Sequence, residues 1–155
     1  MEVSDFLAQD DVVPCAKVTS KRQLLQMLAD KASEKCGFDS QKIFEVLMAR
    51  EQLGSTGLGN GIAIPHGKLK GLDRVIALFA RADSPIEFDS VDDQPVDLAF
   101  MLLAPEGSGA DHLKALSRVA RLLRTETVVD AIRHTKDKAE IYGLLSSTVE
   151  GSAAA

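Results

Sequence analysis

Residues 50–68 read REQLGSTGLGNGIAIPHGK, and the chain is organised around this stretch, with helical patterns before it and strand-like runs after it. The whole chain has 155 residues and 11 glycines, and five of those glycines fall in this stretch: Gly54, Gly57, Gly59, Gly61 and Gly67. Glycine loses the most backbone entropy on folding, so such a cluster needs a reason. Close turns beside a reactive group are one reason, and His66 is the candidate reactive group.

The pattern before this stretch predicts two helices. A Ser-x-x-Gln capping box that begins at Ser20, followed by apolar residues at helical spacing, predicts a helix over residues 21–36. Asp39 can cap a second helix, which places Arg50 in the last turn of that helix. Ahead of both, residues 11–18 are broken by a proline and predict at most an edge strand.

The pattern after the stretch predicts strands. Residues 75–80 and 95–104 form near-continuous apolar runs, which are typical of strands covered by helices on both faces. Between them, residues 83–85 predict a turn and residues 86–88 a possible short strand. Residues 62–64 are a further short candidate, which ends at the following proline.

The C-terminal third predicts helices. Asp111, or the residue before it, can cap a helix that carries His112 in its first turn. Two further helices are predicted over residues 127–134 and 138–147. With about four or five strands, these helices predict a single α/β domain over residues 1–148, followed by a flexible tail of small residues over 149–155.

Composition excludes several classes of function. The net charge of −5 leaves no broad basic surface for nucleic acid or anionic lipid. The longest apolar run, residues 98–104, is too short to span a membrane, and no secretory signal follows Met1, so we expect a soluble, cytoplasmic protein. Cys15 and Cys36 have no CxxC spacing, so we expect two buried free thiols.

The glycine cluster does not match the familiar nucleotide-binding loops. A Walker loop that ends at Lys68 would need glycine at position 62 and Ser or Thr at position 69, where the chain has Ile62 and Leu69. A dinucleotide fingerprint fails because the third glycine comes one place too early. The glycines alone are therefore also compatible with a simple role in shaping turns.

His66 lies between two residues that restrict the backbone. Pro65 fixes the approach to His66, and Gly67 would let the chain turn away after it. An exposed, oriented imidazole can act as a base, a metal ligand or a nucleophile, although a histidine in a loop is also often a plain surface residue. The three histidines lack zinc-helix spacing and no GxSxG motif is present, so we expect neither a metal site nor a cofactor, and nucleophilic histidine remains.

A histidine that accepts a phosphoryl group needs positive charge and hydrogen-bond donors around it. Arg50 offers a planar donor fork, although a cation at a helix C-terminus also has a purely structural role. His112 faces the positive end of a helix dipole, which favours its neutral form, so it could donate a hydrogen bond or orient His66. His134 is expected at the surface.

Two runs of the sequence resemble a known family. REQLGSTGLGNGIAIPHGKLKGLDRV (residues 50–75) and PVDLAFMLLAPEGSGADHLKALSRVARLLR (residues 95–124) are similar to the two signatures of the enzyme IIA (EIIA type-2) proteins of the phosphoenolpyruvate-dependent phosphotransferase system. The resemblance is to the fructose and mannitol class, most closely to its nitrogen-regulatory branch. It covers roughly residues 3–148 and implies one α/β domain with a mixed sheet of about five strands between helices.

The resemblance also implies a function. His66 would receive a phosphoryl group on Nε2 from the phosphohistidine of an HPr-like carrier, with Arg50 and His112 beside it. We add Asn60 as our own hypothesis for a further contact of the phosphoryl group. The phosphorylation state would then regulate partners such as sensor kinases or potassium transporters. Two alternatives stay open: a sugar-specific IIA subunit that passes phosphate to a IIB protein, and a regulator that binds its partners without phosphorylation of His66.

Overall fold

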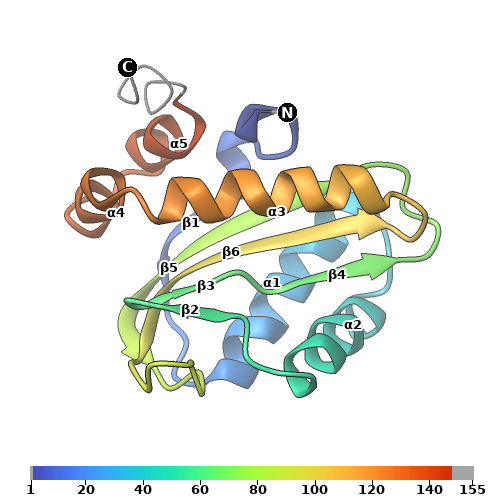
Figure 1. Cartoon of the computed structure of the whole chain (residues 1–155), viewed down its shortest axis with the longest axis horizontal. Helices are drawn as coiled ribbons and strands as arrows, with labels where there is room; N and C mark the ends of the chain where they lie inside the picture. Colours follow the sequence, from blue (N-terminus) through green and yellow to red (C-terminus); the bar gives the residue numbers. More distant parts are fainter. Residues whose placement is uncertain (1, 148–155) are drawn as a thin grey trace.

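The computed structural model describes residues 2–147 and contains one mixed sheet with helices on both of its faces (Figure 1). The six strands are β1 (Val12–Ala16), β2 (Gly57–Gly59), β3 (Ile62–Ala63), β4 (His66–Leu69), β5 (Ile76–Ile86) and β6 (Val96–Pro105). Their order is β1-β5-β6-β3-β2, and β4 also pairs with β6. Two short 3-10 helices, Val3–Asp5 and Gln9–Asp11, precede β1. The expected tail, residues 149–155, lies outside the described residues.

The helices form two layers. They are α1 (Lys21–Cys36), α2 (Ser40–Gln52), α3 (Gly109–Leu123), α4 (Glu126–Arg133) and α5 (Lys138–Ser146). Helices α1 and α2 cover one face of the sheet, and α3 to α5 cover the other (Figure 1). Side chains of β6 alternate between the two cores: Met101 packs with the first layer, whereas Phe100 and Leu102 pack with the second. The prediction of a single α/β domain is confirmed.

The predicted helix ends agree closely with the structure, with one exception. The Ser20 hydroxyl accepts a hydrogen bond from the backbone N–H of Gln23 at 3.1 Å and starts α1, while Gly37 ends it with a φ of 78°. Asp39 caps α2 in the same way. Helix α3 begins earlier than predicted, because its N-cap is Ser108 rather than Asp111 or the residue before it.

The predicted turn at residues 83–85 and the separate strand at 86–88 are wrong, because β5 continues without a break to Ile86. The pairing of β5 with β6 shifts register between Arg81 and Ile86. In such an irregular segment Pro85 removes no regular ladder hydrogen bond, so turn-forming residues are tolerated inside a long strand.

Strands β2 and β4 were not expected from the sequence, whereas β3 agrees with the short candidate strand over residues 62–64. Pro65 separates β3 from β4, but both strands run parallel to β6, with Ile62 opposite Leu98 and His66 opposite Leu102. The N–H of Leu102 donates to the carbonyl of Pro65 at 2.9 Å. The chain therefore resumes the same sheet position after the proline, and β6 fixes the place of His66.

Two smaller expectations can also be compared with the structure. Cys15 and Cys36 are free thiols, as expected, but each is only half-buried rather than buried. Across residues 2–147, none of the helices combines the length and the apolar character that crossing a bilayer requires.

Candidate functional site

His66 is the first residue of β4, and this strand packs against helix α2. Strand β4 packs against α2 at Gly67, where a Cβ atom would come within 2.4 Å of Cγ1 of Val46. Gly67 therefore does not turn the chain away after His66, as the sequence suggested. Its missing side chain instead allows α2 to approach the strand that carries His66.

The two ring nitrogens of His66 have different partners. Nδ1 lies 2.7 Å from the backbone carbonyl oxygen of Ile64, which can only accept, so Nδ1 carries the proton. Nε2 is then the nitrogen with the free electron pair, and it accepts a hydrogen bond from Nε of Arg50 at 3.3 Å. The side chain is half-buried. This tautomer leaves Nε2 as the nucleophilic atom of the ring.

Arg50 reaches His66 from the last turn of α2, as the sequence predicted. Its Nη1 donates to the carbonyl oxygen of Gly54 at 2.8 Å, and this bond holds the guanidinium beside the imidazole. Gly54 adopts a φ of 146°, which favours glycine. Arg50 is half-buried and forms no ion pair with a carboxylate in the described part of the chain, so its charge is available to an anion at Nε2.

His112 comes to the site from the other side of the sheet. It lies in the first turn of α3, is buried, and its ring centroid is 5.7 Å from that of His66 with the two rings at 68° to each other. Its Nε2 is buried and has no hydrogen-bond partner within residues 2–147. A buried, unpaired ring nitrogen is costly and is compatible with a partner that arrives from outside.

Both histidines are held in the neutral form by their surroundings. Burial lowers the pKa of His66 from its usual 6.5, and the charge of Arg50 lowers it further, while the bond to Ile64 and the charge of Glu51 act in the opposite direction. Burial also lowers the pKa of His112, with smaller contributions from His66 and Lys68. A neutral imidazole at cellular pH is the nucleophilic form.

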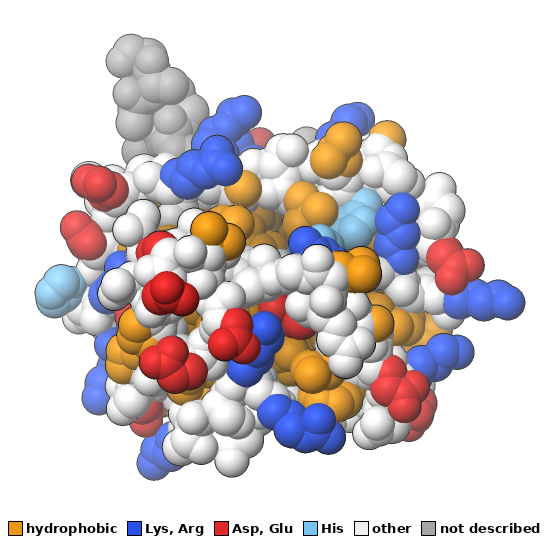
Figure 2. All heavy atoms as spheres, turned by 60° about the horizontal axis from the view of Figure 1, so that its bottom comes forward, with side chains coloured by type: hydrophobic (Ala, Val, Ile, Leu, Met, Phe, Trp, Pro, Cys, Tyr) orange, Lys and Arg blue, Asp and Glu red, His pale blue; other side chains and the backbone are white. Residues whose placement is uncertain are grey.

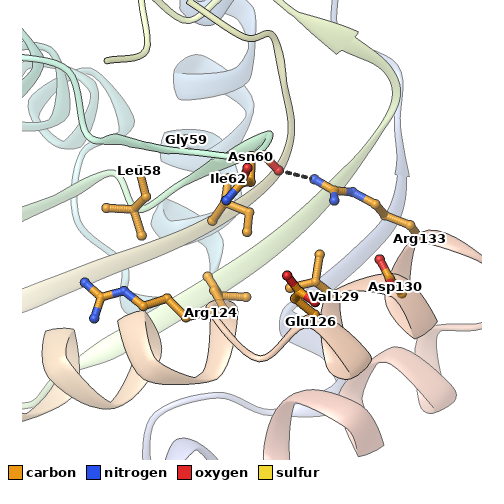
Figure 3. A pocket seen from close by; sticks show the side chains of 10 residues that line it. Leu58, Gly59, Asn60, Ile62, Arg124, Glu126, Val129, Asp130 and Arg133 are labelled. Atoms are coloured by element: carbon orange, nitrogen blue, oxygen red, sulfur yellow. Dashed lines mark hydrogen bonds between the residues drawn. The ribbon is translucent and has the colours of Figure 1, made fainter. Parts of the chain in front are cut away.

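The third predicted contact, Asn60, is placed elsewhere by the structure. Asn60 and Gly61 form the two-residue turn between β2 and β3, with φ angles of 57° and 80°, as in a type I′ hairpin. Its carbonyl oxygen accepts from Nη2 of Arg133 at 2.6 Å (Figure 3). Gly61, the residue after Asn60, lies beside Asp97 of β6, whereas His66 lies beside Leu102. The hairpin turn and His66 are therefore about five residues apart along β6, or about 16 Å.

A pocket of about 620 Å³ opens between the β2–β3 hairpin and helices α3 and α4 (Figure 3). Asn60 lines this pocket, but His66, Arg50 and His112 do not. His134 follows α4 and is exposed, as expected, with its Nδ1 against the carbonyl of Asp130. The structure thus brings Arg50, His66 and His112 together and leaves Asn60 at the other end of the sheet.

The surface around the histidine pair is partly apolar. Leu53, three residues after Arg50, is 85% exposed, and Leu113, next to His112, is 65% exposed. The space-filling view shows histidine side chains in a recess between basic and hydrophobic side chains (Figure 2). In residues 2–147 no group of three or more His, Cys, Asp or Glu side chains is arranged to hold a metal ion.

Sequence reasoning missed the groups that contact His66 and Arg50 from the backbone and the buried charge next to them. The carbonyl oxygens of Ile64 and Gly54 are backbone atoms and carry no signal in the sequence. The buried carboxylate of Glu51 was also missed, because a charged residue beside Arg50 at a helix end looks like a solvent-facing one. The hairpin before His66 did have a signal, since Asn-Gly is the preferred pair for a two-residue turn.

Comparison with known proteins gives one consistent family. The family model described as "Phosphoenolpyruvate-dependent sugar phosphotransferase system, EIIA 2" matches residues 5–148. A nitrogen regulatory protein of Bradyrhizobium diazoefficiens is 53% identical over 146 residues, covering 94% of this chain and 95% of that protein.

Solved structures agree with the sequence matches. The nitrogen regulatory protein IIA-Ntr of Neisseria meningitidis superimposes with a TM-score of 0.88 at 33% identity, over 92% of this chain and 98% of the other. The mannitol enzyme IIA of Escherichia coli, solved in complex with phosphorylated enzyme IIB, has a TM-score of 0.74 over 90% of this chain and 96% of the other. At 19% identity that second match concerns the fold alone.

Proposed function

Because the chain belongs to the EIIA 2 family of the phosphoenolpyruvate-dependent sugar phosphotransferase system, we propose that it is a phosphocarrier of the nitrogen-related branch. In this proposal, His66 accepts a phosphoryl group from the phosphohistidine of an HPr-like protein. The protein is then a component of a phosphotransferase chain rather than an enzyme that turns over a small molecule, and it works in the cytoplasm.

One observation carries the proposal. The bond from Nδ1 of His66 to the carbonyl of Ile64, at 2.7 Å, directs the free electron pair to Nε2. Nε2 is also the nitrogen beside the Arg50 guanidinium. A nucleophile with its electron pair next to a fixed cation is what phosphoryl transfer requires, since this reaction depends mostly on positioning and electrostatics.

The transfer step needs no proton to leave His66. The P–N bond to the donor histidine breaks and its electron pair returns to the donor ring, while the electron pair of Nε2 forms the new P–N bond. The proton on Nδ1 stays in place and continues to donate to Ile64, which stabilises the positive charge that the ring gains.

Two side chains would hold the transferred group. The Nε–H of Arg50, which donates to Nε2 before transfer, can turn to a phosphoryl oxygen after it. The unpaired Nε2 of His112 can donate to a second oxygen and would gain the partner that it lacks. Asn60 is too far along the sheet in this structure to contribute directly, so that part of the prediction would need a movement of the hairpin.

The same surface would then signal to partners. The exposed Leu53 and Leu113 beside the histidine pair offer apolar contact area for a donor protein and for a target. A phosphoryl group adds about −1.5 to −2 charges to this surface and would change which partners bind. Sensor kinases or potassium transporters are the proposed targets, and a sugar IIB protein is the alternative acceptor.

The proposal is tested by incubating the protein with phosphoenolpyruvate, enzyme I and an HPr-like carrier and measuring acid-labile phosphate. Wild type should take up one phosphoryl group, and His66→Ala should take up none. His134→Ala, at an exposed histidine on another part of the surface, is the matched control and should behave as wild type. Uptake by His66→Ala would show that the site is wrong.

Two further measurements separate the alternatives. Rapid onward transfer to a purified sugar IIB protein would favour a sugar-transport role over a regulatory one. Capture of target proteins should differ between the phosphorylated wild type and His66→Ala. Identical capture by both would favour a regulator that binds without phosphorylation.

A further inference from the structure

Glu51, the residue after Arg50, points into the protein. Its side chain is only 2% exposed and pairs with Nζ of Lys21 at 2.9 Å. Its two carboxylate oxygens accept from the backbone N–H of Thr56, at 3.1 and 3.2 Å, and one of them also accepts from the Thr56 hydroxyl. Burial of a carboxylate is costly unless it is paired in this way, so the contact between Glu51 and Thr56 is well defined.

From Thr56, the hydrogen bonds continue to the candidate nucleophile. The carbonyl oxygen of Thr56 accepts from the N–H of Ile64 at 3.1 Å, and the carbonyl oxygen of Ile64 accepts from Nδ1 of His66 at 2.7 Å. Four residues, Glu51, Thr56, Ile64 and His66, thus form one chain of hydrogen bonds, which we name the Glu51–His66 chain. It links the end of α2 to the imidazole across the base of the β2–β3 hairpin.

Electrostatics gives Glu51 a second effect on His66. Its negative charge raises the pKa of His66, while burial and the charge of Arg50 lower it. Arg50 and Glu51 are consecutive residues of α2 and therefore act on His66 in opposite senses. One places a cation at Nε2, and the other supports the proton on Nδ1 through Thr56 and Ile64.

We propose that Glu51 is a positioning residue for phosphoryl transfer. By fixing Thr56 it fixes the Ile64 carbonyl, and this carbonyl holds His66 in the Nδ1–H tautomer with the electron pair on Nε2. The expected effect of Glu51 on the transfer rate rests on the proposed function, whereas its expected effect on the tautomer of His66 does not. A purely structural Glu51 would stabilise the domain and leave the tautomer of His66 unchanged.

The test compares Glu51→Gln with Lys21→Met. Glu51→Gln removes the charge but keeps the shape, whereas Lys21→Met removes the other partner of Glu51 and leaves Thr56 untouched. Long-range ¹H–¹⁵N spectra of the His66 ring and its titration report the tautomer and the pKa. Glu51→Gln should reduce the Nδ1–H population, lower the pKa of His66 further and slow transfer about tenfold, since small displacements of a reacting group are costly.

The remaining variants decide between positioning and stability. Lys21→Met should lose stability but keep the wild-type tautomer of His66. Thr56→Val should change the tautomer of His66 in the same direction as Glu51→Gln. Thr56→Ser keeps the hydroxyl and should keep the wild-type tautomer. A folded Glu51→Gln with the wild-type tautomer and the wild-type transfer rate would overturn the inference, because the lost charge alone can shift the pKa. The spectra need no phosphoryl donor, so wild type that takes up no phosphate would overturn the proposed function and not this one.

Discussion

Arg133 of α4 and Arg50 of α2 lie near opposite ends of strand β6, and the two arginines differ in how completely they are paired. At the hairpin end, defined by Asp97, Arg133 makes two bonds to the Asp97 carboxylate at 2.7 and 2.9 Å and a third to the Asn60 carbonyl. At the histidine end, defined by Leu102, Arg50 faces a neutral imidazole at 3.3 Å.

The difference extends to the groups around each arginine. Gly61 makes room for the pair at the hairpin end, where a Cβ atom would lie 2.5 Å from Nη2 of Arg133. At the histidine end, the buried Nε2 of His112 has no partner within residues 2–147. The hairpin end is thus fully paired, whereas the histidine end keeps an arginine without a carboxylate and an unpaired ring nitrogen, which fits the proposed division between a stabilising end and a functional end.

Removal of Arg50 should have the largest effect on phosphoryl transfer. Arg50→Ala should slow transfer to His66 about hundredfold, because a fixed donor at the transferring group contributes on that scale. Single-turnover transfer from a phosphorylated carrier measures this rate. Arg50→Lys should recover only part of it, since an ammonium cannot reproduce the planar fork. A full wild-type rate in Arg50→Ala would contradict the functional difference between the two ends of β6.

Removal of Arg133 should act on stability instead. Arg133→Ala leaves the partly buried Asp97 carboxylate without its partner, which should cost about 2 kcal/mol in the free energy of unfolding. Urea denaturation measures this loss. The rate of transfer to His66 in the folded variant should match wild type. A large loss of transfer would mean that the two ends are coupled through β6.

Removal of His112, whose Nε2 has no partner within residues 2–147, should have an intermediate effect on transfer. His112→Ala should slow transfer about tenfold, as expected for the loss of one hydrogen bond to the transferred group. His112→Gln, whose amide can also donate, should restore part of the rate. If both variants transfer as wild type does, the buried Nε2 of His112 has no role in holding the phosphoryl group.

Acidity should have the smallest effect. The pKa of His66 lies below 6.5, so lowering the pH from 8 to 6.5 should reduce the neutral fraction, and hence the rate, by about twofold at most. The unfolded chain binds a proton on this histidine more readily than the folded one. The His66 contribution to stability is therefore present above about pH 6.5 and declines as the pH falls. NMR titration of the His66 ring measures the lowered pKa on which both statements depend.

The sequence predicted the helical part of the fold well because helix ends depend on local chemistry. Ser20 and Gly37 bound α1 as expected, through a capped N–H and a left-handed residue. Strand pairing depends on distant partners. The sequence therefore could not show that the chain pairs with β6 both before and after Pro65. It also could not show that Pro85 lies within β5.

The side chains of the candidate site were predicted from the sequence, but the backbone groups that contact them were not. Arg50 and His112 were recognised through residues that resemble a family, and the structure places both beside His66. The carbonyl of Ile64 could not be predicted, because every residue has one and only the folded backbone selects which one faces the ring. Asn60 was wrongly expected beside His66 because the two residues are close in the sequence. In the sheet, the extended chain places them about 16 Å apart.

The bond between Nδ1 of His66 and the Ile64 carbonyl also decides which substitutes can imitate the two states of the proposed phosphocarrier in living cells. Asparagine carries an amide N–H close to the place of Nδ1, so His66→Asn keeps the donor to Ile64 and is a faithful imitation of the unphosphorylated form. Aspartate would set a carboxylate oxygen against that carbonyl, and two acceptors repel each other. If His66 is phosphorylated as proposed, the permanently unphosphorylated form can be encoded genetically, whereas an acidic residue at position 66 is a poor imitation of the phosphorylated one.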